Sequence, residues 1–150
     1  MEGGFGMKIA LGFFVFIMIC MMFLAVPVIS QTDQYYVVAN KQLQGTSIDK
    51  AALKGIYLRE IRNWGNDGGE IIPVDLSSEK DFYQNLFSRS YIQMQAYWLK
   101  MRINHSVSMP VTKKDPESVK SFIASNKNAI GFIRTSDFDD RVKILKVIEK

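Results

Sequence analysis

The sequence has 150 residues, of which 47% are hydrophobic, and a formal net charge of +4. A chain of this length predicts a single domain. The basic excess is mild, and no Lys/Arg run is dense enough for a nucleic-acid tail or a membrane-binding patch. We therefore expect no nucleic-acid partner.

The first thirty residues predict a signal peptide. Lys8 is followed by an uninterrupted apolar run over residues 9–26, and small residues then allow cleavage before Gln31. The alternative is a retained membrane anchor, because this run is just long enough for a bilayer, which takes ~17–25 residues. In either case we expect residues 31–150 to form one exported domain, periplasmic or secreted.

Cys20 is the only cysteine, and it lies inside this segment. Ile19 directly before it is a poor match to a lipoprotein box, where a small residue is needed, so we do not expect lipidation. The exported domain would then have no disulfide and no thiol chemistry. Its stability must come from packing, which a domain of this size can provide.

The first half of the exported part alternates between strand and helix patterns. "YYVVA" at 35–39 is β-branched and aromatic, which predicts a strand. "TSIDKAALKGIYL" has apolar residues at helical spacing and predicts a helix with Ser47 as its N-cap. "EIIPVDL" at 70–76 predicts a second strand, in which Pro73 indicates an edge or an irregular end.

Three helices and two strands follow. Ser78 and Ser90 each precede a helix pattern, whose aromatic residues we expect in the core (Tyr83, Tyr91, Tyr97 and Trp98). After a loop, "DPESV" from Asp115 predicts a third helix, and "AIGFI" and "RVKILKVIE" predict the last strands. The order β-α-β-α-α-α-β-β predicts an α/β fold, a three-layer α/β/α domain with a mostly parallel sheet.

Signatures of an enzyme are scarce. His105 is the only histidine, no cysteine ligand is available, and no nucleophile elbow occurs. "DFDD" at 137–140 is typical of a solvated turn that could collect a hard cation, but it lacks the ordered ligands of a calcium loop. We expect no enzyme activity, no metal and no cofactor.

Two features are compatible with binding. Ser77 and Ser78 lie where a strand passes into a helix, and hydroxyls with free backbone N–H groups there make a candidate anion site. The alternative is that Ser78 is simply an N-cap. Arg59 and Arg62 either face an anionic ligand or, as is usual for exposed arginines, point into solvent.

A family resemblance follows from the order of three segments. "IDKAALKGIYLREIRNWGNDGGEIIPVDL" resembles the leucine-x-x-isoleucine-phenylalanine-leucine-glycine-lysine … asparagine-tryptophan segment of phosphate-binding proteins of ABC transporters, in the type 2 periplasmic-binding superfamily. "FYQNLFSRSYIQMQAYWLKM" and "ASNKNAIGFI" follow in the family's order, so the likeness runs from about Tyr36 to Ile133. The resemblance implies a single lobe of such a protein, since full members have two lobes with ligand between them.

The resemblance also implies a site and shows where this chain departs from it. In ligand-binding relatives an Arg and a nearby Ser-Gly-Thr hold phosphate, whereas this chain reads "VDLSSEKDF". Asp75 lies near the expected Arg, where a carboxylate would repel an anion, and only Ser77 and Ser78 carry over. One hypothesis is therefore weak binding of phosphate or another small oxyanion, linked to ABC transport. The other is a periplasmic protein-interaction module that has lost ligand binding and docks on a transport or envelope protein, with the oligomeric state open.

Overall fold

A computed structural model describes residues 34–65 and 68–149. The segment predicted as a signal peptide or anchor, residues 1–30, lies outside the described residues. The elements, in chain order, are β1 (Tyr35–Ala39), β2 (Ser47–Asp49), α2 (Lys50–Tyr57), β3 (Ile72–Leu76), α3 (Asp81–Phe87), α4 (Tyr91–His105), β4 (Val111–Lys113), α5 (Pro116–Ser125), β5 (Ala129–Arg134), the 3-10 turn η1 (Thr135–Asp137) and β6 (Lys143–Ile148).

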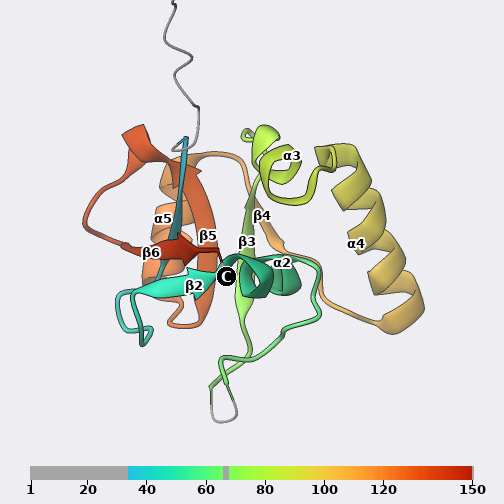
Figure 1. Cartoon of the computed structure of the whole chain (residues 1–150), viewed down its shortest axis with the longest axis horizontal. Coiled ribbons are helices and arrows are strands. Elements are labelled where there is room, and N and C mark those ends of the chain that lie inside the picture. The colour runs from blue at the N-terminus through green and yellow to red at the C-terminus, as the bar shows by residue number, and fades with distance from the viewer. Residues whose placement is uncertain (1–33, 66–67, 150) are drawn as a thin grey trace, which may run out of the picture. The chain divides into compact units, whose positions relative to one another are not determined.

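The strands form one six-stranded sheet with the order β2-β6-β1-β5-β3-β4 (Figure 1). β1 is antiparallel to both of its neighbours, β5 and β6. The other three pairings, β2 with β6, β3 with β4 and β3 with β5, are parallel. All strands except β1 therefore run in one direction, and the mostly parallel sheet expected from the sequence is confirmed.

Helices cover both faces of the sheet. Consecutive strand residues point to opposite faces, and β5 shows what covers each one. A side chain at Gly131 would meet Ile123 of α5 at 2.9 Å. The Phe132 ring instead stacks on Phe82 of α3, with ring centroids 3.6 Å apart. The close approach of α5 requires the glycine, and the three-layer arrangement is confirmed.

Two short strands differ from the sequence expectation. β2 and β4 have three residues each and form the two edges of the sheet. They are too short to show an alternating pattern, so β2 was expected within a helix and β4 within a loop. β3 is accordingly an inner strand, but its pairing with β4 begins only at Val74. Pro73 therefore lies one residue before the point where β4 begins to pair with β3.

The starts of α2, α4 and α5 follow local capping rules, with one correction to a predicted cap. Asp49, not Ser47, is the N-cap of α2 and accepts from the Ala51 N–H at 2.7 Å. Ser90 caps α4 in a capping box with Gln93, as its position predicted. Asp115 accepts from the Ser118 N–H at 2.8 Å and starts α5.

The stretch around Trp64 connects α2 to β3 and is held in place structurally. Trp64 is half-buried against the core and donates its ring N–H to the Asn128 carbonyl at 3.3 Å. Gly65 has a positive φ of 62°, and Asn63 pairs with Glu70 beyond the turn. Glycine accepts this backbone conformation without strain. Trp64 and Gly65 thus have structural roles where the chain passes from α2 to β3.

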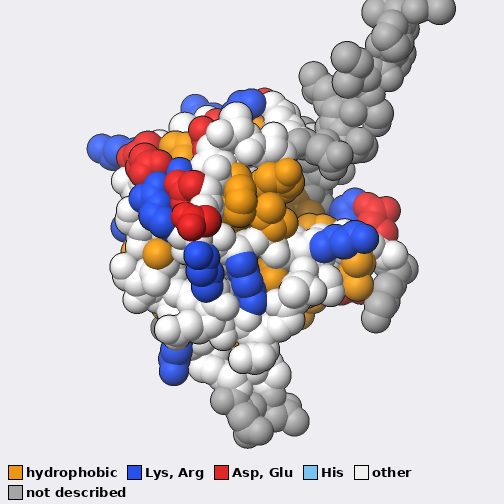
Figure 2. Space-filling model, turned by 90° about the vertical axis from the view of Figure 1, so that its left-hand side faces the viewer, with side chains coloured by type: hydrophobic (Ala, Val, Ile, Leu, Met, Phe, Trp, Pro, Cys, Tyr) orange, Lys and Arg blue, Asp and Glu red, His pale blue; other side chains and the backbone are white. Residues whose placement is uncertain are grey.

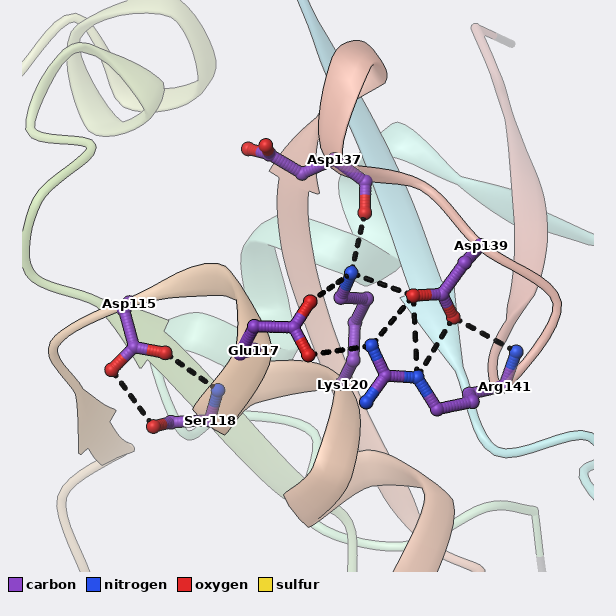
Figure 3. Close-up of polar contacts among 7 residues, drawn as sticks. All are labelled: Asp115, Glu117, Ser118, Lys120, Asp137, Asp139 and Arg141. Carbon is purple, nitrogen blue, oxygen red and sulfur yellow. Dashed lines mark hydrogen bonds and ion pairs between the residues drawn. The ribbon is translucent and has the colours of Figure 1, made fainter.

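A cluster of ion pairs joins the start of α5 to the segment before β6 (Figure 3). Lys120 is buried, and its ammonium contacts Glu117 at 2.6 Å, Asp139 at 2.7 Å and the Asp137 carbonyl at 2.8 Å. Arg141 contacts both carboxylates and, together with Lys120, holds the pKa of Asp139 well below its usual range. The acidic turn expected to be solvated, with room for a hard cation, thus binds the protein's own ammonium group.

The described part of the chain has its own hydrophobic core, which extends from Val37 to Leu145. A domain with a core of this extent can fold alone, and residues 31–150 contain all of it. Within this described part, no helix combines the length and the apolarity needed to cross a membrane.

Candidate anion-binding site

The candidate site lies at the edge of the sheet where β3, β4 and β5 end, which we call the carboxyl edge. These parallel strands finish at Leu76, Lys113 and Arg134. In open α/β sheets, ligands bind outside the carboxyl ends of the strands. The sequence-predicted residues Ser77 and Ser78 follow directly after Leu76, so the fold places both of them at this edge.

Ser77 is tied to the neighbouring strand. Its N–H and its hydroxyl both donate to the Lys113 carbonyl, at 2.9 Å and 3.2 Å. The hydroxyl proton is therefore already used, and Ser77 offers an incoming ligand only the lone pairs of its oxygen. Ser78 is exposed. Of the two predicted residues, Ser78 is the one whose hydroxyl faces water.

The helix after these serines begins later than its expected N-cap implies. α3 starts at Asp81, and its N-cap is Lys80, which makes no side-chain capping bond. The interpretation of Ser78 as an N-cap is therefore wrong. Asp81 adds a negative charge to the first turn of this short helix. An anion approaching the start of α3 meets a carboxylate there, which weakens its attraction to the helix N-terminus.

The capping difference between two serines gives a direct test. Ser90→Ala removes the capping box of α4 and should lower the free energy of unfolding by ~0.5–2 kcal/mol. Ser78→Ala removes an exposed hydroxyl that caps nothing and should leave stability nearly unchanged. Urea unfolding followed by circular dichroism measures both. Equal losses in the two variants would contradict this assignment.

Three residues that the sequence reasoning missed meet beside Ser78. Glu79 accepts from the Arg134 Nε–H at 2.8 Å and from the Tyr35 hydroxyl at 3.1 Å. A second guanidinium nitrogen of Arg134 lies 2.7 Å from the Glu79 carboxylate. Burial, with the bond to Glu79, raises the pKa of Tyr35 to about 12. The one available signal was that Arg134 directly follows the apolar run of β5, at a strand's carboxyl end.

Asp75 does not face this edge. It is fully buried, and its carboxylate accepts hydroxyl hydrogen bonds from Tyr83 at 2.6 Å, Tyr91 at 2.8 Å and Thr112 at 3.2 Å. Burial raises its pKa, and the three hydrogen bonds offset part of that shift. The expectation that Asp75 repels an anion is therefore corrected, because Glu79 is the carboxylate at the carboxyl edge.

The other charged candidates lie away from the carboxyl edge. Arg59, expected to point into solvent or toward a ligand, is buried and bonded to Glu70 at 3.0 Å and to the Ile71 carbonyl at 3.1 Å. Arg62 is exposed, as expected. His105 is the exposed last residue of α4. Among the described residues, no three His, Cys, Asp or Glu side chains converge as a metal ion would require.

This geometry sets what the site can do chemically. Arg134 is 40% exposed in its side chain and can donate to an oxyanion. Glu79 already occupies it with a charge-assisted pair. An incoming anion must therefore share the Arg134 guanidinium with Glu79 or displace Glu79 from it. That competition permits weak anion binding and works against tight binding.

Solved structures resemble this fold, although no protein-family model matches the chain and no curated protein does. An ABC-type phosphate transport receptor from Vibrio cholerae has a TM-score of 0.53 and 20% identity, over 77% of this chain and 46% of its own. A putative phosphate ABC transporter substrate-binding protein with bound phosphate, from Clostridium perfringens, has a TM-score of 0.55 and 22% identity, over 77% and 45%. A possible phosphate binding protein from Planctomyces limnophilus has a TM-score of 0.58 and 14% identity, over 78% and 42%.

These neighbours are described as transport and binding proteins rather than enzymes. The chain spans less than half of the length of each of these three. The resemblance inferred from the three sequence segments is confirmed at the level of the fold. Over the matched part, which is less than half of each receptor, this chain has the fold of the phosphate-binding receptors of ABC transporters.

Proposed function

We propose that this protein is an exported, single-lobe binding domain that holds phosphate or a similar small oxyanion weakly at the carboxyl edge, at Ser77 and Ser78. Its role would be linked to phosphate uptake through an ABC transporter. The observation that carries the proposal is the position of both serines at the carboxyl edge, directly before Glu79, whose carboxylate pairs with Arg134, where this class of sheet binds ligands. The fold shared with proteins described as phosphate receptors supports the choice of anion.

The affinity we expect is low for an electrostatic reason. Glu79 pairs with Arg134, and Asp81 lies in the first turn of α3. Both carboxylates reduce the positive potential that would draw an anion to the edge. Ser78 and part of the Arg134 guanidinium remain as donors.

Thermal unfolding of residues 31–150 with and without millimolar phosphate tests the proposal. A ligand that binds only the folded state stabilises it by about 1.4 kcal/mol at tenfold excess over Kd, a shift of several degrees in Tm. We expect this shift with phosphate and a smaller one with sulfate. The double variant Ser77→Ala/Ser78→Ala should lose the shift whatever its own Tm is.

Glu79→Gln sharpens this test, because it frees Arg134 while keeping a side chain of the same shape. We expect a larger phosphate shift in this variant than in the natural sequence, since its uncharged amide no longer competes with the anion. No phosphate shift in either protein would overturn the oxyanion proposal. A shift that survives the double serine variant would place the anion elsewhere.

A second candidate function is a protein-interaction module without ligand binding. Exposed hydrophobic side chains gather on the side of the molecule that carries β6, next to acidic and basic groups (Figure 2). Ile144 faces the same side of the sheet as Val38, and Phe138 packs edge-to-face on Tyr36 with ring centroids 5.8 Å apart. Phe138 and Ile144 are partly exposed. Such a patch favours docking on a protein of the envelope.

A further inference from the structure

α4 has apolar side chains on two opposite faces. Tyr91, Met94 and Trp98 are buried on its inner face. An outer stripe is formed by Ile92, Ala96, Leu99 and Ile103, all exposed. The inner face accounts for packing in the core, and the outer stripe has no such role in the fold.

The outer stripe is narrow and continuous. At 100° per residue its four members lie within an arc of about 60° along the whole helix. Ile92 and Ile103, near its two ends, are 76% and 70% exposed, and Leu99 between them is 43% exposed. Scattered surface apolar residues need no explanation, whereas an aligned stripe indicates a binding surface.

Basic side chains border the stripe on both sides. Lys100 and Arg102 are exposed and lie about 80° to either side of Ile92 around the helix axis. α4 contains no acidic residue. The outer face of α4 thus has an apolar centre, a cation on each flank and no negative charge of its own.

α4 lies on the outer side of the domain, away from β6 (Figure 1), and the large side chains of its outer stripe are exposed. Its inner side contacts α3 through Trp98 and Tyr83, and it also bonds to α2 and β3 through Trp98 and Tyr91. Because the helix spans about 22 Å at 1.5 Å per residue, it presents a long and accessible surface. The charge of that surface indicates its occupant.

We propose that α4 is an interfacial helix whose outer face binds the surface of a membrane that contains anionic lipid. The apolar stripe would enter the boundary between headgroups and acyl chains, while Lys100 and Arg102 extend to the lipid phosphates. A second copy of this chain fits less well. Two apposed α4 helices would bring four such cations together with no acidic side chain of α4 to pair with them.

The sequence shows no run of basic residues, so this surface was not expected from it. Lys100 and Arg102 are separated by Met101, which is half-buried on the other side of the helix. Only the helical geometry places the two cations around one apolar stripe.

Sedimentation of residues 31–150 with lipid vesicles tests the proposal. We expect binding to vesicles of phosphatidylglycerol mixed with phosphatidylcholine, little binding to phosphatidylcholine alone, and release at high salt. Lys100→Gln/Arg102→Gln should weaken binding roughly 25-fold, at about fivefold per cation. Ile92→Ser and Ile103→Ser should each weaken it roughly tenfold.

The matched control is Lys114→Gln/Lys127→Gln, which removes the same charge from exposed positions outside α4. It should bind nearly as well as the natural sequence. Equal loss in the two double variants would mean attraction to net charge alone and would overturn the proposal. A dimer in analytical ultracentrifugation that Ile92→Ser dissolves would also overturn it, since a second copy would then occupy the stripe. Circular dichroism confirms that each variant is folded.

Discussion

Replacing Trp98 with alanine is expected to lower the free energy of unfolding by about 3–5 kcal/mol. Trp98 is 2% exposed, its ring packs edge-to-face on Tyr83, and its ring N–H donates to the Tyr57 carbonyl at 2.8 Å. The substitution removes the largest side chain that holds α4 on the core and leaves that carbonyl without its partner. Domains are typically stable by about 5–15 kcal/mol, so the variant should be partly unfolded under mild conditions.

Urea unfolding followed by far-ultraviolet circular dichroism measures this loss. Trp98→Phe, which keeps a ring but loses the hydrogen bond, should lie between the natural sequence and alanine. Trp64→Ala is the matched control, because Trp64 is only half-buried at the rim of the core, and it should cost clearly less. A Trp98→Ala variant as stable as Trp64→Ala would contradict the described packing of α4.

Tyr83→Phe is expected to lower stability by ~1.5–3 kcal/mol at neutral pH, because a hydrogen bond to a charged group is lost. The Tyr83 hydroxyl donates to the buried carboxylate of Asp75 at 2.6 Å. Phenylalanine keeps the ring and its aromatic contacts, so the change is confined to this bond.

The loss should depend on pH in a defined direction. Burial raises the pKa of Asp75 above its ordinary value of 3.8, and the bond from Tyr83 lowers it again. The pKa of such a carboxyl is higher in the folded state than in the unfolded state. The free energy of unfolding therefore falls as the pH rises from 3.8, the ordinary value, through the folded-state pKa. Without the hydroxyl, that pKa rises further, so the gap between variant and natural sequence should widen with rising pH.

Tyr97→Phe separates this effect from the loss of any hydroxyl. The Tyr97 hydroxyl donates to the neutral Leu58 carbonyl at 2.9 Å, so its removal should cost about 0.5–1.5 kcal/mol at every pH of the series. Desolvation by burial, the largest cause for each, raises the pKa of both tyrosines above 10.0, so neither hydroxyl titrates in this interval. A Tyr83→Phe loss that stays constant with pH would mean that Asp75 does not ionise in the folded state.

Both of these predictions concern positions that the sequence could identify only in part. Helical spacing placed Tyr83, Tyr91 and Trp98 in the core, and all three are buried. Their hydroxyl and ring N–H partners could not be predicted, because they come from other elements. Asp75 illustrates this, because no local pattern indicated that α3, α4 and β4 surround it with three donors.

The candidate site likewise combines residues that could be predicted from the sequence with residues that could not. Ser77 and Ser78 could be found from a strand-to-helix junction, which is a local pattern. The residues beside them could not, because Tyr35 and Arg134 lie 44 and 55 positions from Glu79 along the chain. Their meeting depends on the register of β1 against β5, where Tyr35 is opposite Arg134.

The alternation of helices and strands, the buried stripes and the likeness to one half of a phosphate receptor could all be predicted from the amino-acid sequence. These depend on periodicity and on turn residues, which act over a few positions. The two edge strands, the pairing of Glu79 with Arg134, the burial of Arg59 and the exposed outer face of α4 became evident only in the folded structure. Such features depend on strand register and on which helix face the core takes, and both are set by contacts between segments that are distant in the chain.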